Sequence, residues 1–222
     1  MDFDGTTRSM LLEKANLITR IFAIIYYSTL MNFLAHVFLS GNDEEIIVGN
    51  FIADFVKGKK KDEYPQQIKR GIELHRMIDD FTDHHPVVLR SQSRIRHHQG
   101  RYSGVVIDLF FDHFLAKNFS EYHPDSLKSF SEQTYSVLKR HWHVLPIGVH
   151  LFLPFMIGRN WLLNYSTIEG IDRTLKGISR RVSFENKMNE AVEDLRENYS
   201  ELETDFKEFF AELIKFVQFK LK

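Results

Sequence analysis

The side chains best suited to chemistry lie in a segment, Arg101 to Asn118, that is apolar on nearly all sides when drawn as a helix. Asp108 and Asp112 are four residues apart and therefore share one helix face, and His113 lies beside them. Carboxylates among Val, Ile, Leu and Phe are costly to bury unless an arginine or a metal ion compensates their charge. The segment therefore predicts either buried salt bridges or one wall of a metal site.

Three earlier apolar segments carry the same kinds of side chain. His36 lies in MNFLAHVFL and Asp54 lies in VGNFIADFV. His75 and Asp79 in GIELHRMID are four residues apart and share a helix face. Imidazole and carboxylate groups together bind Mg²⁺, Mn²⁺, Fe or Zn²⁺, and mixed nitrogen and oxygen ligands favour the transition metals. One shared metal site between helices accounts for all these groups, whereas the alternative is a set of unrelated core histidines and salt bridges.

The composition excludes several classes of protein and site. The chain has 222 residues, of which 43% are hydrophobic and 27% charged, as in one globular domain with a substantial core. The absence of cysteine excludes disulfides, thiolate metal sites and cysteine nucleophiles. A net charge of −1 argues against nucleic-acid binding through overall electrostatics. Because no strand alternation or glycine-rich phosphate loop is visible, we predict a single all-α domain.

Helix boundaries are indicated by capping residues and helix breakers. Asn42 and Glu45 form a capping-box pattern that predicts a helix closing at Gly58. Pro65 is suited to a helix start, and the helix that follows it is expected to end near Asp83.

Towards the C-terminus the pattern changes twice. Gly148, Pro154 and Gly158 interrupt an apolar stretch, which predicts a kink or short helices. From Phe184 to the end, apolar residues keep three-and-four spacing, which predicts a long amphipathic helix that is acidic on its outer face.

The first 30 residues differ in sequence pattern from the rest of the chain. The apolar run Ile21 to Leu30 is about half the length of a membrane span, and no small-x-small cleavage site follows it. We expect residues 1–30 to be an extension upstream of a domain at 31–222, and the alternative is a helix that packs on that domain. Either interpretation predicts a cytoplasmic protein without a membrane span.

Positive charge gathers between Lys57 and Arg101. This region has eleven Lys or Arg residues against six Asp or Glu, a local net charge of +5 in a chain whose total is −1. It is either a solvated face or a docking surface for an acidic partner. No aromatic platform interleaves with these basic residues, so single-stranded nucleic acid is disfavoured as a partner.

Four motifs resemble those of the bacterial acyl carrier protein phosphodiesterases. They are MNFLAH, GNFIADFVKG, GIELHRMIDDFTDHHP and RYSGVVIDLFFDHFLAKN, and the likeness runs from Met31 essentially to the C-terminus. The resemblance implies an all-helical bundle related to the HD phosphohydrolases. It also implies a Mn²⁺-dependent reaction, linked to fatty acid biosynthesis, that removes 4′-phosphopantetheine from holo-acyl carrier protein. Mg²⁺ and Fe²⁺ are the alternative metals.

The resemblance also assigns roles to residues by their position. It makes His36, Asp54, His75 and Asp112 the main metal-site candidates. Further ligands, or residues that support the ligands, are Asp79, Asp108 and His113. The sequence departs from the HD superfamily because it has no adjacent His-Asp dipeptide.

Three other roles follow from the chemistry that the resemblance implies. His75 or His113 could protonate the leaving serine oxygen, and Arg76 could contact the non-bridging phosphate oxygens. The basic region 57–101 would then receive the acidic carrier protein. The competing interpretations are an HD-type metal phosphohydrolase acting on a nucleotide or small phosphate ester, and a non-catalytic helical interaction protein.

Overall fold

The computed structural model describes residues 33–182 and 184–221, so the prediction about residues 1–30 lies outside the described residues. All regular elements in the described residues are helical, which confirms the predicted all-α fold. The α-helices are α2 (Phe33–Leu39), α3 (Glu44–Ile52), α4 (Gln66–His84), α5 (Pro86–Gln99), α6 (Ser103–Lys117), α7 (Leu127–Arg140), α8 (Ile147–Gly158), α9 (Trp161–Asn164), α10 (Ile168–Ser179), α11 (Ala191–Glu197) and α12 (Tyr199–Leu221). Short 3₁₀ helices join them at η1 (Ala53–Phe55), η2 (Gly58–Glu63), η3 (Gly100–Tyr102), η4 (Phe119–Glu121), η5 (Trp142–Val144) and η6 (Met188–Glu190).

Across the described ranges, no helix combines the length and the apolar character needed to cross a membrane.

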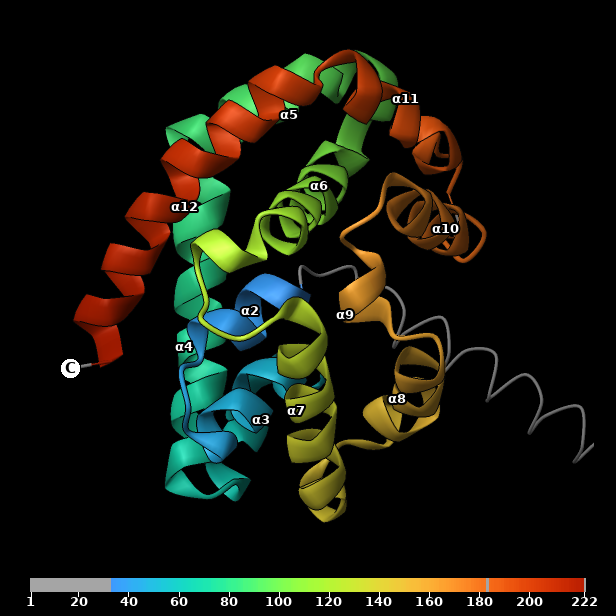
Figure 1. Cartoon of the computed structure of the whole chain (residues 1–222). Coiled ribbons are helices and arrows are strands. Elements are labelled where there is room, and N and C mark those ends of the chain that lie inside the picture. Colours follow the sequence, from blue (N-terminus) through green and yellow to red (C-terminus); the bar gives the residue numbers. More distant parts are fainter. Residues whose placement is uncertain (1–32, 183, 222) are drawn as a thin grey trace, which may run out of the picture.

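Helix α6 runs through the centre of the molecule (Figure 1). It contacts α2, α5, α10 and α12, and its Phe110 and Phe114 are fully buried. A helix that is hydrophobic on all sides belongs in a protein interior, so the surroundings of α6 agree with its sequence. The helix that carries Asp108 and Asp112 is therefore a core element.

Helices α3 and α4 approach each other unusually closely, and they lie side by side in Figure 1. A Cβ atom on Gly49 would lie 2.0 Å from the backbone oxygen of Ile68, and one on Gly71 would lie 2.3 Å from that of Ile46. Real Cβ atoms do not make contacts this short, so both positions require glycine. The two glycines set the distance between the helices that carry Asn50 and His75.

Several predicted boundaries were wrong. The cap of α3 is Asp43 rather than Asn42, because the Asp43 carboxylate accepts hydrogen bonds from the first free backbone N–H groups of that helix. The helix ends at Ile52 rather than Gly58, since the chain tightens into η1 and Gly58 (φ +60°) opens η2 instead.

The C-terminal region is not one continuous helix. It breaks at Asn198 between α11 and α12, where the Asn198 side chain donates a hydrogen bond to the Asp194 carbonyl. Helix α12 is still long and amphipathic, as predicted. The predicted interruption occurs at Gly158, where α8 ends before the four-residue α9, whereas Gly148 and Pro154 lie within α8.

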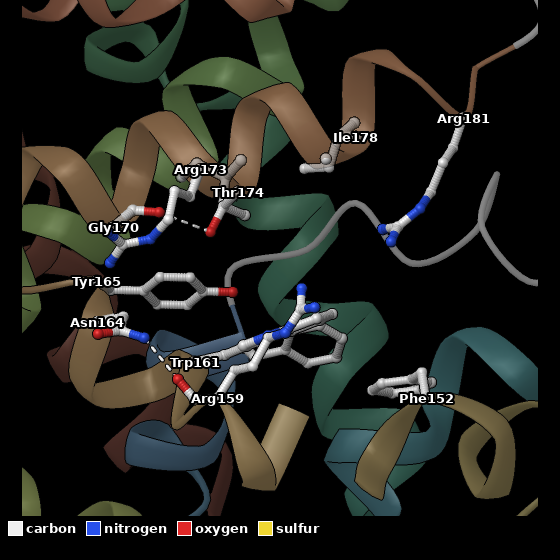
Figure 2. Close-up of a pocket in the computed structure, with 13 residues that line it drawn as sticks. Phe152, Arg159, Trp161, Asn164, Tyr165, Gly170, Arg173, Thr174, Ile178 and Arg181 are labelled. Atoms are coloured by element: carbon white, nitrogen blue, oxygen red, sulfur yellow. Dashed lines mark hydrogen bonds between the residues drawn. The ribbon is translucent and has the colours of Figure 1, made fainter. Parts of the chain in front are cut away.

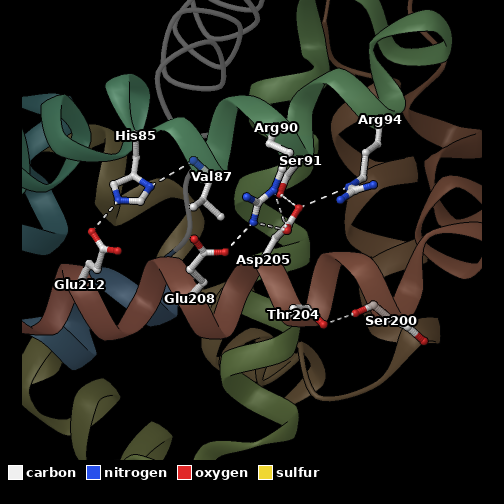
Figure 3. A network of polar contacts seen from close by, with 10 residues as sticks. All are labelled: His85, Val87, Arg90, Ser91, Arg94, Ser200, Thr204, Asp205, Glu208 and Glu212. Carbon is white, nitrogen blue, oxygen red and sulfur yellow. Dashed lines mark hydrogen bonds and ion pairs between the residues drawn. The ribbon is translucent and has the colours of Figure 1, made fainter.

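The acidic face of α12 packs against the basic helix α5 (Figure 3). Asp205, only 2% exposed, accepts hydrogen bonds from Arg90 and Ser91 and forms an ion pair with Arg94. Burial acts to raise the pKa of Asp205, but its hydrogen bonds and the two arginines hold that pKa below its ordinary value. Part of the basic region 57–101 is thus paired with acidic residues of the same chain.

We expect Gly71→Ala to lower the free energy of unfolding by about 1–3 kcal/mol, the usual range for overpacking a tight contact. The added methyl group would overlap the Ile46 carbonyl and force α3 and α4 apart. Chemical denaturation measures the loss. Gly104→Ala in α6 is the matched control, because its methyl group would meet only the flexible Gln92 side chain at 3.5 Å. Equal stability of the two variants would contradict the close-approach argument.

Candidate metal centre

Four of the predicted metal-site residues converge in the structure. His36 Nε2 lies 3.2 Å from Asp79 Oδ1, and His75 Nε2 lies 3.2 Å from Asp79 Oδ2. His75 Nε2 also lies 3.4 Å from Asp54 Oδ1. The two imidazole rings are stacked with their centroids 4.1 Å apart. The side chains come from α2, η1 and α4, so elements separated in sequence build one site.

Asn50 on α3 orients both histidines. Its Nδ2 donates hydrogen bonds to the His36 carbonyl and to Ser40 Oγ, which identifies Oδ1 as the free acceptor. Oδ1 lies 2.8 Å from His36 Nδ1 and 3.0 Å from His75 Nδ1. Because an amide oxygen can only accept, both Nδ1 atoms carry their hydrogens. In the neutral rings, both Nε2 lone pairs therefore face the Asp79 carboxylate, and that of His75 also faces Asp54.

Two lone pairs that face two carboxylates require a positive charge between them. Both Nε2 atoms are buried, and their contacts with the carboxylates lack hydrogen-bond geometry. A buried polar atom without a partner costs free energy, and a cation bound by all four side chains removes that cost. The donor set of two imidazole nitrogens and two carboxylates suits a divalent transition metal. The residues present thus fit a metal ion.

The close packing of these side chains shifts the pKa values of His36, His75 and Asp79. Burial lowers the pKa of His75, but its contacts with Asp54 and Asp79 outweigh burial and raise it to about 9. Burial and the charge of His75 lower the pKa of His36. Burial alone would raise the pKa of Asp79, yet the two histidines hold it well below its usual range. With no metal bound, a proton on His75 supplies the positive charge.

The site has a closed side and an open side. The side chains of His36 and His75 are only 2% and 5% exposed, whereas those of Asp54 and Asp79 are 18% and 36% exposed. A ligand therefore reaches the site from the carboxylate side, while the histidines form its floor.

Asp112 makes a different set of contacts from the one its predicted role implies. Its two carboxylate oxygens accept hydrogen bonds from the backbone N–H groups of Leu34 and Ala35, at 3.0 and 2.9 Å. Burial raises its pKa to about 7, although those two hydrogen bonds act in the opposite direction. The carboxylate thus holds the first turn of α2, which carries His36. Its role as a metal ligand stays a prediction.

Asp108 is half-buried on α6, and the charge of Asp79 in the candidate centre affects its pKa. Burial raises its pKa well above the ordinary value, and the negative charges of Asp79, Asp83 and Asp112 add to that effect. It is not within the group of ligand atoms that lie close together, namely those of His36, His75 and Asp79. Asp108 stays a candidate further ligand.

His113 lies away from the centre. Its Nδ1 donates to the Tyr165 carbonyl at 2.8 Å, and its Nε2 pairs with the Tyr199 hydroxyl at 2.9 Å. Both ring nitrogens therefore have partners, and burial lowers the pKa of the ring. Arg76 is exposed beside His75, and its Nη2 donates to the Val56 carbonyl just after η1.

Two features were missed at the sequence level. Asn50 lies in the quoted segment VGNFIADFV, where a lone amide among apolar residues was the available signal. A second group that could hold a metal, His97, His98 and Asp194, joins α5 to α11. His98 and Gln99 both bond the buried Asp194 carboxylate, so these contacts already have a structural role.

Comparison with known proteins identifies the family. A family model described as acyl carrier protein phosphodiesterase matches residues 31–213. The chain belongs to the acyl carrier protein phosphodiesterase family. Proteins of that name from Photorhabdus laumondii, Serratia proteamaculans and Escherichia coli are each 30% identical to it, over 181, 186 and 190 residues. The matches cover 81%, 83% and 83% of this chain and 91%, 96% and 96% of the relatives.

No solved structure matches the chain. The predicted relation of this family member to the HD phosphohydrolases therefore stays a prediction.

We expect the metal-free protein to lose stability as the pH rises from about 6.5 to about 9. A pKa raised in the folded state adds stability that is complete below the unfolded value and disappears above the folded value. The contribution is up to about 3.5 kcal/mol, since the pKa rises by about 2.5 units and one unit is worth about 1.4 kcal/mol. Chemical denaturation in excess chelator, at several pH values, measures the slope.

His75→Gln should remove most of this pH dependence, and His84→Gln is the control. His84 is on the same helix, and its side chain is 79% exposed. A slope unchanged in His75→Gln would contradict the assignment of the proton to His75.

Proposed function

We propose that this protein hydrolyses the phosphodiester bond that joins 4′-phosphopantetheine to a serine of holo-acyl carrier protein. The products are apo-acyl carrier protein and 4′-phosphopantetheine. Membership of the acyl carrier protein phosphodiesterase family supports the reaction. The observation that carries the proposal is the convergence of two imidazole nitrogens and two carboxylates, arranged by Asn50 to face a cation.

His36, Asp54, His75 and Asp79 are the residues that would hold the metal ion. Their mixed ligand atoms fit Mn²⁺, with Mg²⁺ and Fe²⁺ as the alternatives. A divalent ion there would neutralise charge on the phosphodiester and lower the pKa of water. Asn50 keeps both Nε2 atoms available to the ion by occupying both Nδ1–H groups.

Arg76 is suited to binding the phosphodiester itself. It is exposed, follows His75 on α4, and uses one N–H group on the Val56 carbonyl. A guanidinium has five N–H donors, so others remain for the non-bridging phosphate oxygens. The contact with Val56 also holds the guanidinium near η1, which carries Asp54. We propose that Arg76 orients the diester at the open side of the centre.

His75 and His113 were both candidates to protonate the leaving serine oxygen. The Nδ1–H of His75 is donated to Asn50, and its Nε2 is the atom that faces the ion. His113 is hydrogen-bonded at both nitrogens, to Tyr165 and Tyr199. We therefore assign His75 to metal binding and His113 to the packing of α6 against α12.

The acidic carrier protein would meet the exposed lysines that follow η1. Several basic residues of the region 57–101 are already paired within the chain, including Lys61 with Glu73 and Arg90 with Asp205. Lys57, Lys59 and Lys60 are exposed and form no ion pair with another described residue. They lie within a few residues of Asp54, so a carrier protein bound to them would present its prosthetic group at the metal centre.

The reaction is tested by mass spectrometry of holo-acyl carrier protein. After chelation and addition of Mn²⁺, the protein should remove the mass of the prosthetic group. Asp79→Asn should lower kcat/KM by more than roughly 100-fold, since it removes a charged ligand shared by both histidines. Asp80→Asn, at a neighbouring exposed position on the same helix, should retain activity.

Two results would overturn the proposed function. Turnover of nucleotides alone would favour the general phosphohydrolase. Absence of any bound divalent ion in calorimetry would favour a non-catalytic helical protein.

Reversal of Lys59 and Lys60 to Glu should raise KM for the carrier protein roughly tenfold while leaving kcat and the turnover of a small diester unchanged. Repulsion between like charges weakens the encounter, and the effect should shrink with added salt. Lys128 and Lys139, both exposed on α7, provide a control of equal charge change. An equal loss on the carrier protein and the small diester would contradict a docking role.

A further inference from the structure

Three side chains outside the candidate metal centre come together where the end of α5 meets α11. His97 and His98 lie in the last turn of α5, and Asp194 lies on α11. Each offers one ligand atom, and these three atoms all lie within 4.8 Å of one another. Two imidazole nitrogens and one carboxylate oxygen suit Zn²⁺ and the other late divalent transition metals. The proposed reaction assigns no role to these residues.

Asp194 is held in place by contacts with its neighbours. The residue is only 1% exposed, and the Gln99 amide donates a hydrogen bond to its Oδ2 at 2.6 Å. Its other oxygen, Oδ1, lies 3.0 Å from His98 Nδ1. The Asn198 side chain donates to the Asp194 backbone carbonyl. The carboxylate is therefore fixed before any ligand binds, with Oδ1 facing His98.

The distance between His98 and Asp194 fits a shared metal ion. Two ligand atoms of a tetrahedral Zn²⁺, each about 2.0 Å from the ion, are about 3.3 Å apart. The observed 3.0 Å is close to that separation. A neutral imidazole carries its hydrogen on either ring nitrogen, so His98 can present the Nδ1 lone pair to an ion. Only a small movement of the two side chains is then needed.

Two observations are left unexplained by contacts within the chain. His97 is exposed and forms no hydrogen bond or ion pair with another described residue, yet its ring stacks on that of His98 with centroids 5.1 Å apart. Gln99 is 3% exposed, and its side-chain oxygen has no hydrogen-bond partner among the described residues. A buried acceptor without a partner costs free energy. A water molecule bound to an ion beside Asp194 would supply the missing donor.

We propose that His97, His98 and Asp194 bind a Zn²⁺ ion, with water molecules completing its coordination. The ion joins α5 to α11, a helix of seven residues that is too short to be stable by itself. Helix α11 packs on α10, which forms one wall of a cavity of about 340 Å³ (Figure 2). The ion therefore holds the α10–α11 part of the bundle against α5 and takes no part in phosphodiester hydrolysis.

Calorimetry with Zn²⁺ alone, on the full chain after chelation, tests the site. Asp54→Asn combined with Asp79→Asn serves as the background, because it removes both carboxylates of the candidate metal centre. In this background, His97→Gln should lower the Zn²⁺ affinity at least tenfold, since one of three ligands is lost. His143→Gln, at an exposed histidine on η5, is the matched control and should bind as the background does. Equal affinities of the two variants would overturn the proposal.

Thermal unfolding separates metal binding from packing. His97→Gln removes no hydrogen bond, so its Tm in chelator should equal that of the background. Excess Zn²⁺ should raise the Tm of the background by mass action, and His97→Gln should lose most of this rise. If His97→Gln instead lowers the Tm equally with and without Zn²⁺, His97 contributes by packing and the proposal fails.

Nuclear magnetic resonance identifies the ligands directly. In the same background, one equivalent of Zn²⁺ should shift the ring resonances of His97 and His98 and leave those of His143 unchanged. Resonances of His97 and His98 that move only at large excess of Zn²⁺, or together with those of His143, would show an adventitious ion only and would overturn the site.

Discussion

The candidate site depends on how closely helices α3 and α4 approach each other. Gly49 and Gly71 let the two backbones come so near that any side chain at either position would overlap a carbonyl of the opposite helix. Asn50 directly follows the first glycine, and His75 is one helical turn beyond the second. At this separation the Asn50 amide oxygen reaches the His75 ring and the His36 ring together. A wider spacing would separate the Asn50 amide oxygen from the His75 ring.

A second constraint positions the short helix α2. Seven residues are too few for a helix to be stable by itself in water. Asp112, from the central helix α6, accepts the first backbone N–H groups of α2. The bond runs between segments almost 80 residues apart and fixes the direction in which His36 projects. Asp112, itself a candidate metal ligand, thus also positions the helix that carries the candidate ligand His36.

The basic residues of the region 57–101 divide into those that pair with acidic residues of the chain and those that stay exposed. The sequence shows a basic stretch and an acidic C-terminal helix, and the fold sets part of one against the other. Asp205 is buried with Arg90 and Arg94 around it, so these arginines hold α5 to α12 rather than facing a partner. In the same basic stretch, Lys57, Lys59 and Lys60 stay exposed after η1.

The sequence by itself indicated the all-helical class, the family, and seven candidate metal-site residues, with His36, Asp54, His75 and Asp112 as the main candidates and Asp79, Asp108 and His113 as further ones. The helical class and the candidate groups follow from side-chain type and from three-and-four spacing, which are local properties of the chain, whereas the family and the ranking of the candidates follow from the resemblance of four motifs. Only the tertiary structure showed that Asp79 lies between the two histidines, while Asp112 caps α2 and His113 packs beneath α12. It also decided that Asn50 orients the two imidazole rings. Those outcomes depend on the distance and angle between helices, which periodicity along a single helix does not encode.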